Sequence, residues 1–269
     1  MFQSFEPDDG VLHGEHFRQE EKRYNLIYRI VEYPEAMMVK SADDRLILAQ
    51  SPGFKPWLWI SSGMDTGIRM EWARLAAEHL QNHDLPGVSA SKEIAEAFAE
   101  AYCEPRGKLY HTYMMLEAYY CPQVVQPLGV PGHMQQAGEE HVAVIAEFMA
   151  CFVKDALGRQ EEAEQFRKHA EEAVRSGILY LWVIDSIPVS MAAIAHRSER
   201  LARINDVYTP DRYRKRGYAS ALVAGLCTQL LQEGLTPVLY ADGSNPDSNK
   251  VYQSIGFLGA GSIAEIRFD

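Results

Sequence analysis

Two short segments contain the residue types that could hold an anionic ligand and take part in chemistry. The first is VYTPDRYRKRGYAS, residues 207–220, in which three consecutive basic residues precede Gly217. A strand is expected to end at Thr209, and a helix to begin near Ala219. Because a helix N-terminus presents unpaired N–H groups and a partial positive charge, this loop could hold a phosphate. The alternative is a surface loop whose basic side chains are only solvated.

The second segment is LYADGSNPDSNKVYQSIGF, residues 239–257. Asn245, Asn249 and Tyr252 are spaced by four and three residues, which places them on one face of a helix. Asparagine offers a donor and an acceptor to an amide-bearing ligand, and tyrosine offers a hydroxyl. A helix cap at Asn245 and a packing aromatic at Tyr252 are the structural alternatives.

The apolar pattern predicts the elements that position both segments. After a Pro- and Gly-rich stretch at Cys121–His133, we expect two helices, three strands, a helix, a strand, a helix and closing strands. Their expected ranges are 139–156, 159–175, 178–184, 188–195, 201–208, 219–232, 237–240, 245–255 and 257 onward.

The first half predicts a loosely similar order of elements, so we interpret it as a diverged duplicate. The expected ranges are a helix at 16–31, strands at 36–39, 46–50 and 57–61, helices at 70–81 and 92–102, and a strand at 110–120. The Pro- and Gly-rich stretch then separates an N-terminal α/β domain, residues 1–125, from a second domain, residues 132–269.

At this point the two segments resemble a known family. Arg214-x-x-Gly217-x-Ala219 is similar to the Q/R-x-x-G-x-G/A motif of the GNAT superfamily of N-acetyltransferases, and residues 245–257 resemble that superfamily's following motif. The resemblance covers residues 132–269. It implies an α/β (α+β) fold with a mixed, mostly antiparallel central sheet flanked by helices, and two tandem GNAT-like domains.

The resemblance also implies a role for each matching position, with acetyl-CoA as co-substrate and without a metal. The strand end would pair with the pantetheine arm, the basic loop would hold the pyrophosphate, and the asparagines would contact the pantetheine end or the adjacent loop. Tyr252 would lie near the thioester sulfur as the catalytic residue. The implied cofactor-binding residues are Val207, Tyr208, Thr209, Arg214, Lys215, Arg216, Gly217, Tyr218, Ala219, Ser220, Asn245, Asn249 and Tyr252.

The implied function is direct transfer of an acetyl group from acetyl-CoA to an amine of a small molecule or peptide. A strand N–H at Val207 or Tyr208 could stabilise the oxyanion, and Tyr252 could donate a hydrogen bond to the leaving thiolate. The base is not identified by the sequence: Asn205, Asp206 and Asp242 lie near the expected strands, and each also suits a structural role. Two alternatives stay open, a non-catalytic acyl-CoA sensor or partner-binding module, and an enzyme for a longer acyl group.

Composition narrows the remaining classes. The chain has 269 residues, 47% of them apolar, and a net charge of −11, which disfavours nucleic acid as a partner. Because no apolar segment is long enough for a membrane span and no signal is recognised, we expect a cytoplasmic monomer or homodimer. Scattered cysteines predict reduced, mostly buried thiols, including Cys151 and Cys227. His79 and His83 have metal-site spacing but no third ligand, so a solvated helix face is expected.

Overall fold

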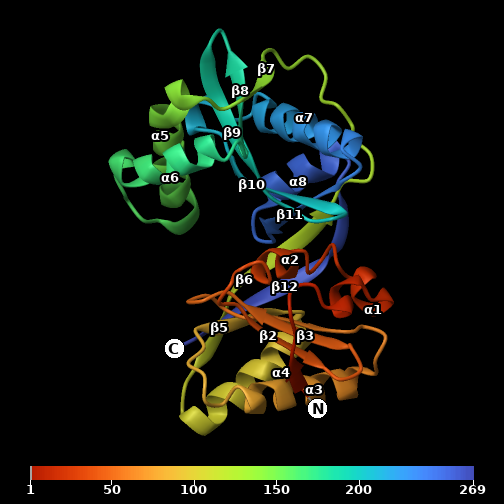
Figure 1. Ribbon diagram of the computed structural model, residues 1–269. Coiled ribbons are helices and arrows are strands. Elements are labelled where there is room, and N and C mark those ends of the chain that lie inside the picture. Colours follow the sequence, from red (N-terminus) through yellow and green to blue (C-terminus); the bar gives the residue numbers. More distant parts are fainter. Residues whose placement is uncertain (1) are drawn as a thin grey trace. The chain divides into compact units, whose positions relative to one another are not determined.

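The computed structural model describes the chain from residue 2 to residue 269, except for the side chains of residues 156 and 157 (Figure 1). Two compact units are found. Unit 1 comprises Met1–Tyr119, Tyr240–Pro246 and Gly259–Asp269, and unit 2 comprises Tyr120–Leu239 and Asp247–Leu258. The expected domains, 1–125 and 132–269, were each continuous in sequence. The compact units are not, because residues 240–246 and 259–269 from the C-terminal half belong to unit 1.

The strand pairing confirms the expected fold class, a mixed and mostly antiparallel α+β architecture. In unit 1 the hydrogen-bonded order is β1-β2-β3-β4-β5-β12-β6, and in unit 2 it is β11-β10-β9-β8-β7. Parallel pairs in the described residues are β4 with β5 and β10 with β11. Residues 240–242 of β11 and 259–268 of β12 belong to unit 1.

Unit 1 is built from short strands and two longer helices. Helices α3 and α4 cover one face of its sheet, and η1, α1 and α2 cover the other (Figure 1). The alternation along β3 shows why: Leu46 and Leu48 pack with the α3 and α4 side, and Ile47 with the other. The elements are β1 (Phe2–Ser4), η1 (Gly10–His13), α1 (Glu15–Arg18), α2 (Leu26–Ile30), β2 (Met37–Ser41), β3 (Leu46–Gln50), β4 (Trp57–Ile60), α3 (Thr66–His79), β5 (Gly87–Ala90), α4 (Lys92–Cys103), η2 (Glu104–Arg106) and β6 (Tyr110–Tyr120).

Two expectations for the first half are wrong. The helix expected at 16–31 is two short helices joined by turns, because the amide of Asn25 donates to the carbonyl of Lys22 and competes with the helical ladder. The segment from Pro86 to Ser89, whose Pro-Gly pair is typical of a turn and for which no strand was expected, lies mostly in strand β5. β5 is fully buried and pairs with β12 from Gly87↔Arg267 to Ala90↔Ala264.

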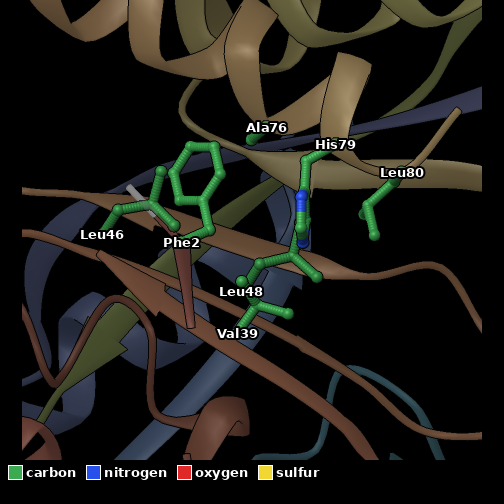
Figure 2. Close-up of a pocket in the computed structure, with 7 residues that line it drawn as sticks. All are labelled: Phe2, Val39, Leu46, Leu48, Ala76, His79 and Leu80. Atoms are coloured by element: carbon green, nitrogen blue, oxygen red, sulfur yellow. The ribbon is translucent and has the colours of Figure 1, made fainter. Parts of the chain in front are cut away.

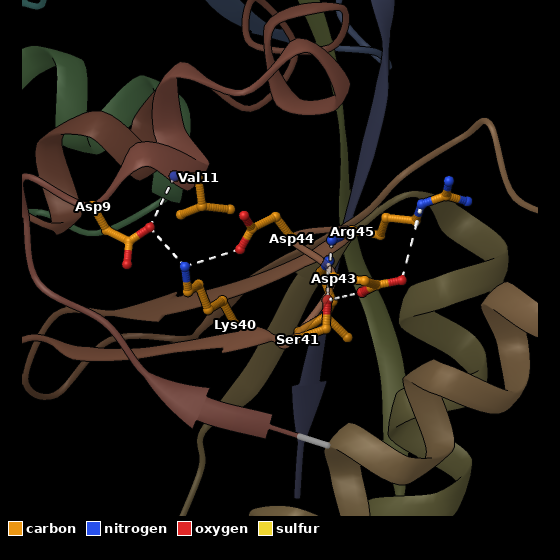
Figure 3. Close-up of polar contacts among 8 residues, drawn as sticks. Asp9, Val11, Lys40, Ser41, Asp43, Asp44 and Arg45 are labelled. Atoms are coloured by element: carbon orange, nitrogen blue, oxygen red, sulfur yellow. Dashed lines mark hydrogen bonds and ion pairs between the residues drawn. The ribbon is translucent and has the colours of Figure 1, made fainter.

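The β2–β3 connection is held by a polar network (Figure 3). The ammonium of Lys40 lies 2.7 Å from Asp9 and 2.9 Å from Asp44. Ser41 Oγ accepts hydrogen bonds from the backbone N–H groups of Arg45 and Leu46, both at 3.0 Å. These contacts satisfy a buried lysine and a tight turn, so this network has a structural role.

Unit 2 combines helices α5, α6, α7 and α8 with a sheet of longer strands. Helices α5 and α6 cover one face of β8–β10, and α7 packs on the other (Figure 1). The core between α5, α6 and the sheet includes Phe148, Leu181, Met191 and Tyr208. The elements of unit 2 are β7 (His133–Gln136), η3 (Glu139–His141), α5 (Val142–Leu157), α6 (Ala163–Arg175), β8 (Leu179–Ile184), β9 (Ile187–Arg197), β10 (Leu201–Tyr208), η4 (Asp211–Tyr213), α7 (Tyr218–Gln232), most of β11 (Thr236–Asp242) and α8 (Pro246–Ile255). The last strand of the chain, β12 (Leu258–Phe268), belongs to unit 1 except for Leu258.

The two halves repeat one order of elements. In each half, three consecutive antiparallel strands are followed by a helix, a strand parallel to the third one, and a second helix. The series is β2-β3-β4-α3-β5-α4 in the first half and β8-β9-β10-α7-β11-α8 in the second. This repetition agrees with the interpretation of the first half as a diverged duplicate. Among the described residues, none of the helices combines the length and apolar character needed to cross a membrane.

Candidate functional site

The two parallel strands of unit 2 separate part-way along their length. Their register runs from Leu201↔Thr236 to Arg203↔Val238, and in the described residues no further pair follows. The last five residues of β10, from Ile204 to Tyr208, therefore lack β11 as a ladder partner on that side. Backbone N–H and C=O groups without a ladder partner are available to an extended ligand that binds like an added strand.

A β-bulge lies in this separated part of β10. Asn205 faces Ala193 and Tyr208 faces Met191, so β10 advances three residues while β9 advances two. The extra residue is accommodated at Asp206, whose φ is +51°. A bulge frees backbone groups from the ladder and redirects side chains, and such irregularities are frequent beside active sites.

A buried serine in the neighbouring strand β9 fixes the end of β10 by hydrogen bonds. The hydroxyl of Ser190 lies 3.0 Å from the carbonyl oxygen of Tyr208, to which it donates, and 2.8 Å from the hydroxyl of Thr209. Ser190 is fully buried in β9. Because this serine bonds to the last strand residue, the backbone at 207–209 is fixed before any ligand arrives.

The N-terminus of α7 carries no side-chain cap. Gly217 is the N-cap residue at φ +81°, and no side chain bonds to the first turn. Lys215 is also left-handed, at φ +61°. Left-handed residues in a turn direct successive N–H groups into one concavity, and an uncapped first turn adds further unpaired donors. The loop thus has the backbone form of an anion site.

The basic residues of this loop are not equivalent. The guanidinium of Arg214 lies 2.6 Å from Asp155 of α5, and its Nε donates to the carbonyl oxygen of Thr209 at 2.8 Å. Arg214 therefore braces the loop, with its charge largely compensated. Lys215 and Arg216 are exposed, and the described residues provide neither with an ion pair. These two cations remain to attract a phosphate.

Asp155 also reaches the end of β10. Its carboxylate accepts a hydrogen bond from the hydroxyl of Tyr208 at 3.0 Å. Burial, followed by this carboxylate, raises the pKa of Tyr208 above its ordinary value. Because Tyr208 stays neutral and its ring packs edge-on against Phe148 and Phe152, its side chain is structural, and only its backbone is offered to a ligand.

Glycine at 217 is required for a reason that the sequence did not reveal. In the structure a Cβ at this position would lie 2.9 Å from the side chain of Val130, in the Pro- and Gly-rich stretch. The positive φ and this close contact both select glycine, so the Pro- and Gly-rich stretch itself packs against the turn before α7.

Helix α8 carries the second predicted group. Tyr252 is buried, with its ring 5.8 Å from that of Phe257, and burial raises its pKa to about 12. Asn249 is partly exposed one turn earlier, and Asn245 is exposed immediately before the helix, where its N–H donates to Asp242. Asn249 and Tyr252 thus share a helix, as expected, while their contact with a coenzyme stays a prediction.

Other candidate features carry little chemistry. A small hollow under α3 is lined by Phe2, Val39, Leu46, Leu48, Ala76, His79 and Leu80 (Figure 2). It leaves essentially no room for a water molecule, so it is not a ligand pocket. His79 and His83 are both exposed, as expected for a solvated face, and the ring of His79 lies 5.4 Å from that of Phe2. Cys151, expected to be buried, is exposed, because the apolar face of α5 is formed by Ile145, Phe148 and Met149.

Sequence reasoning missed several residues that build this site. Asp155 and Val130 are distant in sequence from the loop they support, and no local pattern connects them. Ser190 offered a signal, because it is a polar residue in an otherwise apolar strand. The bulge at Asp206 has no signature in the apolar pattern.

Comparisons with known proteins agree with this geometry. A sequence profile described as the Acetyltransferase (GNAT) family matches residues 142–257. A GNAT-family acetyltransferase from Colwellia psychrerythraea has a similar structure, with a TM-score of 0.57 and 14% identity over 100% of this chain and 98% of that one. A GCN5-related N-acetyltransferase from Sphaerobacter thermophilus gives 0.59 and 12%, with 100% and 95% covered.

A tandem GNAT protein from the clavulanic acid biosynthesis pathway is also similar, with a TM-score of 0.52, 14% identity, and coverage of 100% of this chain and 98% of that one. A search among curated protein sequences found no significant match. Fold and site together define the class, a mixed-sheet α+β protein with the GNAT fold. The C-terminal half of the chain belongs to the GNAT acetyltransferase family.

Proposed function

We propose that this protein transfers an acetyl group from acetyl-CoA directly to an amine. The observation that carries the proposal is the pairing of an uncapped helix N-terminus at Gly217 with a separated, bulged strand at 204–208. The first suits a pyrophosphate, and the second suits an amide-bearing arm. Membership of a family that typically uses acetyl-CoA supports the same co-substrate.

The bulge also supports the chemical step. When an amine attacks the thioester carbonyl, negative charge develops on the oxygen, and a fixed N–H donor stabilises it. The backbone N–H of Val207 or Tyr208 is suited to this task, because Ser190 and Arg214 hold the residues that follow in place. A rigid donor needs no reorganisation as the charge forms.

Tyr252 is proposed as the group that stabilises the leaving thiolate. Its pKa of about 12 lies above the ordinary value of about 8.5 for a thiol, so complete proton transfer would cost roughly 4–5 kcal/mol. A hydrogen bond from the hydroxyl to the sulfur avoids that cost. Tyr252 thus acts as a hydrogen-bond donor, and the final proton reaches the thiolate from the amine through water.

The experiment uses the full chain, acetyl-CoA and a panel of primary amines, including polyamines, aminoglycosides and peptides with free N-termini. Calorimetry measures acetyl-CoA binding, and a thiol reagent measures CoA release. An enzyme releases CoA faster when an acceptor is present, whereas an acyl-CoA sensor binds without release. Butyryl-CoA and decanoyl-CoA in parallel test the acyl length, and faster turnover with either would replace acetyl as the group transferred. Failure to bind any of the three would refute the proposal.

A further inference from the structure

Asp206 occupies an unusual position in the fold. Among residues 2–269, five non-glycine residues have a positive φ, namely Asp44, Asp185, Ser186, Lys215 and Asp206. Four of them lie in turns or bends, where the conformation reverses the chain. Asp206 alone among these five lies within a strand, where an ordinary residue could continue the ladder without a bulge. Backbone strain of this kind persists where the surroundings hold it in place, and it is concentrated at functional sites.

The surroundings of this carboxyl group are those of a base rather than of an ion pair. Asp206 is partly buried, and burial raises its pKa, with smaller opposing effects from His169 of α6 and Arg203 of β10. A carboxyl group whose pKa is raised is better suited to accept a proton at physiological pH.

Its place in the chain brings this carboxyl group to the reacting atoms. Asp206 directly precedes Val207 and Tyr208, whose backbone is proposed to hold the thioester. Its carboxyl group therefore belongs to the bulged segment that is proposed to hold the thioester carbonyl. A bulge redirects a side chain from its ordinary place in the strand, and bulges are frequent beside active sites.

We infer that Asp206 at the β10 bulge binds the acceptor as an ammonium ion and takes its proton, which selects cationic primary amines. This inference rests on the proposed function. The carboxylate removes one proton from R–NH₃⁺, and the freed lone pair forms the N–C bond while the C–S bond breaks. The second proton leaves the nitrogen and reaches the CoA thiolate through water. The proton on Asp206 returns to solvent, so that one proton is released per turnover.

The test compares two nucleophiles in the Asp206→Asn variant. Asparagine tolerates a positive φ, so the bulge is retained. Propylamine, like a lysine side chain of pKa about 10.4, is protonated at neutral pH and needs a base, whereas hydroxylamine is already largely uncharged. We expect acetyl transfer to propylamine to fall at least 10²-fold, in the range for losing a general base, and transfer to hydroxylamine to stay within threefold. The matched control is Asp185→Asn, the same change at an exposed left-handed residue, which should alter neither rate.

The outcomes separate this inference from the proposed function. If the wild-type protein does not bind acetyl-CoA, the proposed function itself is contradicted. Equal losses with both nucleophiles would show that Asp206 only shapes the bulge, and no loss would show that it is uninvolved; either result overturns the inference. If the wild type binds acetyl-CoA but transfers to neither amine, carboxyl ¹³C NMR of Asp206 with bound CoA decides. A shift on adding propylammonium, absent with sodium, supports the inference, and no shift overturns it.

Discussion

The strand–helix connection β4–α3 of unit 1 and the connection β10–α7 of unit 2 have the same place in the order of elements. They differ in how the N-terminus of the helix is capped. In the first, the carboxylate of Asp65 accepts hydrogen bonds from the N–H groups of Gly67 and Ile68, and Glu20 accepts one from Ser62 at 2.8 Å. In the second, Gly217 leaves the helix N-terminus uncapped. In unit 1 the backbone N–H groups at the start of the helix are therefore bound by the protein's own carboxylates. In unit 2 the corresponding N–H groups are left for a phosphate.

The difference extends to the strand and to the following helix. β4 pairs with β3 in unbroken register from Trp57↔Ala49 to Ile60↔Leu46, whereas β10 is bulged. The fourth and seventh residues of α4 are Ala95 and Phe98, and those of α8 are Asn249 and Tyr252. The first half has the same order of elements but carries apolar side chains at these positions. The second half carries polar side chains there, which could contact a ligand.

The largest effect is expected at Tyr252. Tyr252→Phe makes α8 resemble α4 at this position, removing only the hydroxyl and keeping the ring against Phe257. We expect kcat to fall about 10²-fold, with acetyl-CoA affinity nearly unchanged. Tyr180→Phe is the control, because that hydroxyl only accepts a bond from Gln229. Full turnover in a stable Tyr252→Phe protein would show that this hydroxyl does not stabilise the leaving thiolate.

The second expected effect concerns charge at the uncapped helix. Arg216→Glu reverses an exposed cation beside the first turn of α7 without altering Gly217 or its contact with Val130. Acetyl-CoA affinity measured by calorimetry should fall about tenfold, or about 1.4 kcal/mol. Lys168→Glu makes the same charge change on the exposed surface of α6 and should leave the affinity within twofold. Equal effects in the two variants would mean that only the overall charge matters.

A third prediction concerns the capped helix. Asp65→Ala removes the cap of α3 and should lower the free energy of unfolding by about 1 kcal/mol, measured by urea denaturation. The acetyl-CoA affinity should not change, and calorimetric titration of the wild type should give one site per chain. Two equivalent sites, or an altered affinity in this variant, would show that unit 1 binds the coenzyme as well.

The smallest effect is a pH-dependent one at the bulge. Because burial raises the pKa of Asp206, the folded protein holds this proton more tightly than the unfolded chain. The stability that the protonated acid contributes is present at low pH and is lost as pH rises from the ordinary 3.8 through the raised value. Asp206→Asn should therefore melt at a higher temperature than the wild type at pH 7, and this gain should vanish below pH 3.8. A gain that does not vary with pH would exclude burial of the charge as its cause.

The sequence predicted what depends on local pattern and missed what depends on distant contacts. Apolar periodicity located α7 and β10 to within two residues, and the motif around Gly217 identified the family. The role of Arg214 as a brace depends on Asp155, which lies 59 positions away, and the reason for Gly217 depends on Val130. Strand β5 was missed because Pro86 and Gly87 are typical of turns, whereas its burial comes from pairing with β12.

The pairing of β12 with β5 has a consequence for synthesis of the chain. Unit 1 contains residues 1–119 but also 259–269, which are added about 140 residues later. β5 ends at Ala90, and its partner residues 264–267 follow about 175 residues later, so at roughly 5–20 residues per second β5 would wait about 9–35 s for its partner strand to be translated. During that interval a buried apolar strand of the final protein has an open edge, of the kind that chaperones shield. The unit that is made first is therefore the one whose sheet is completed last.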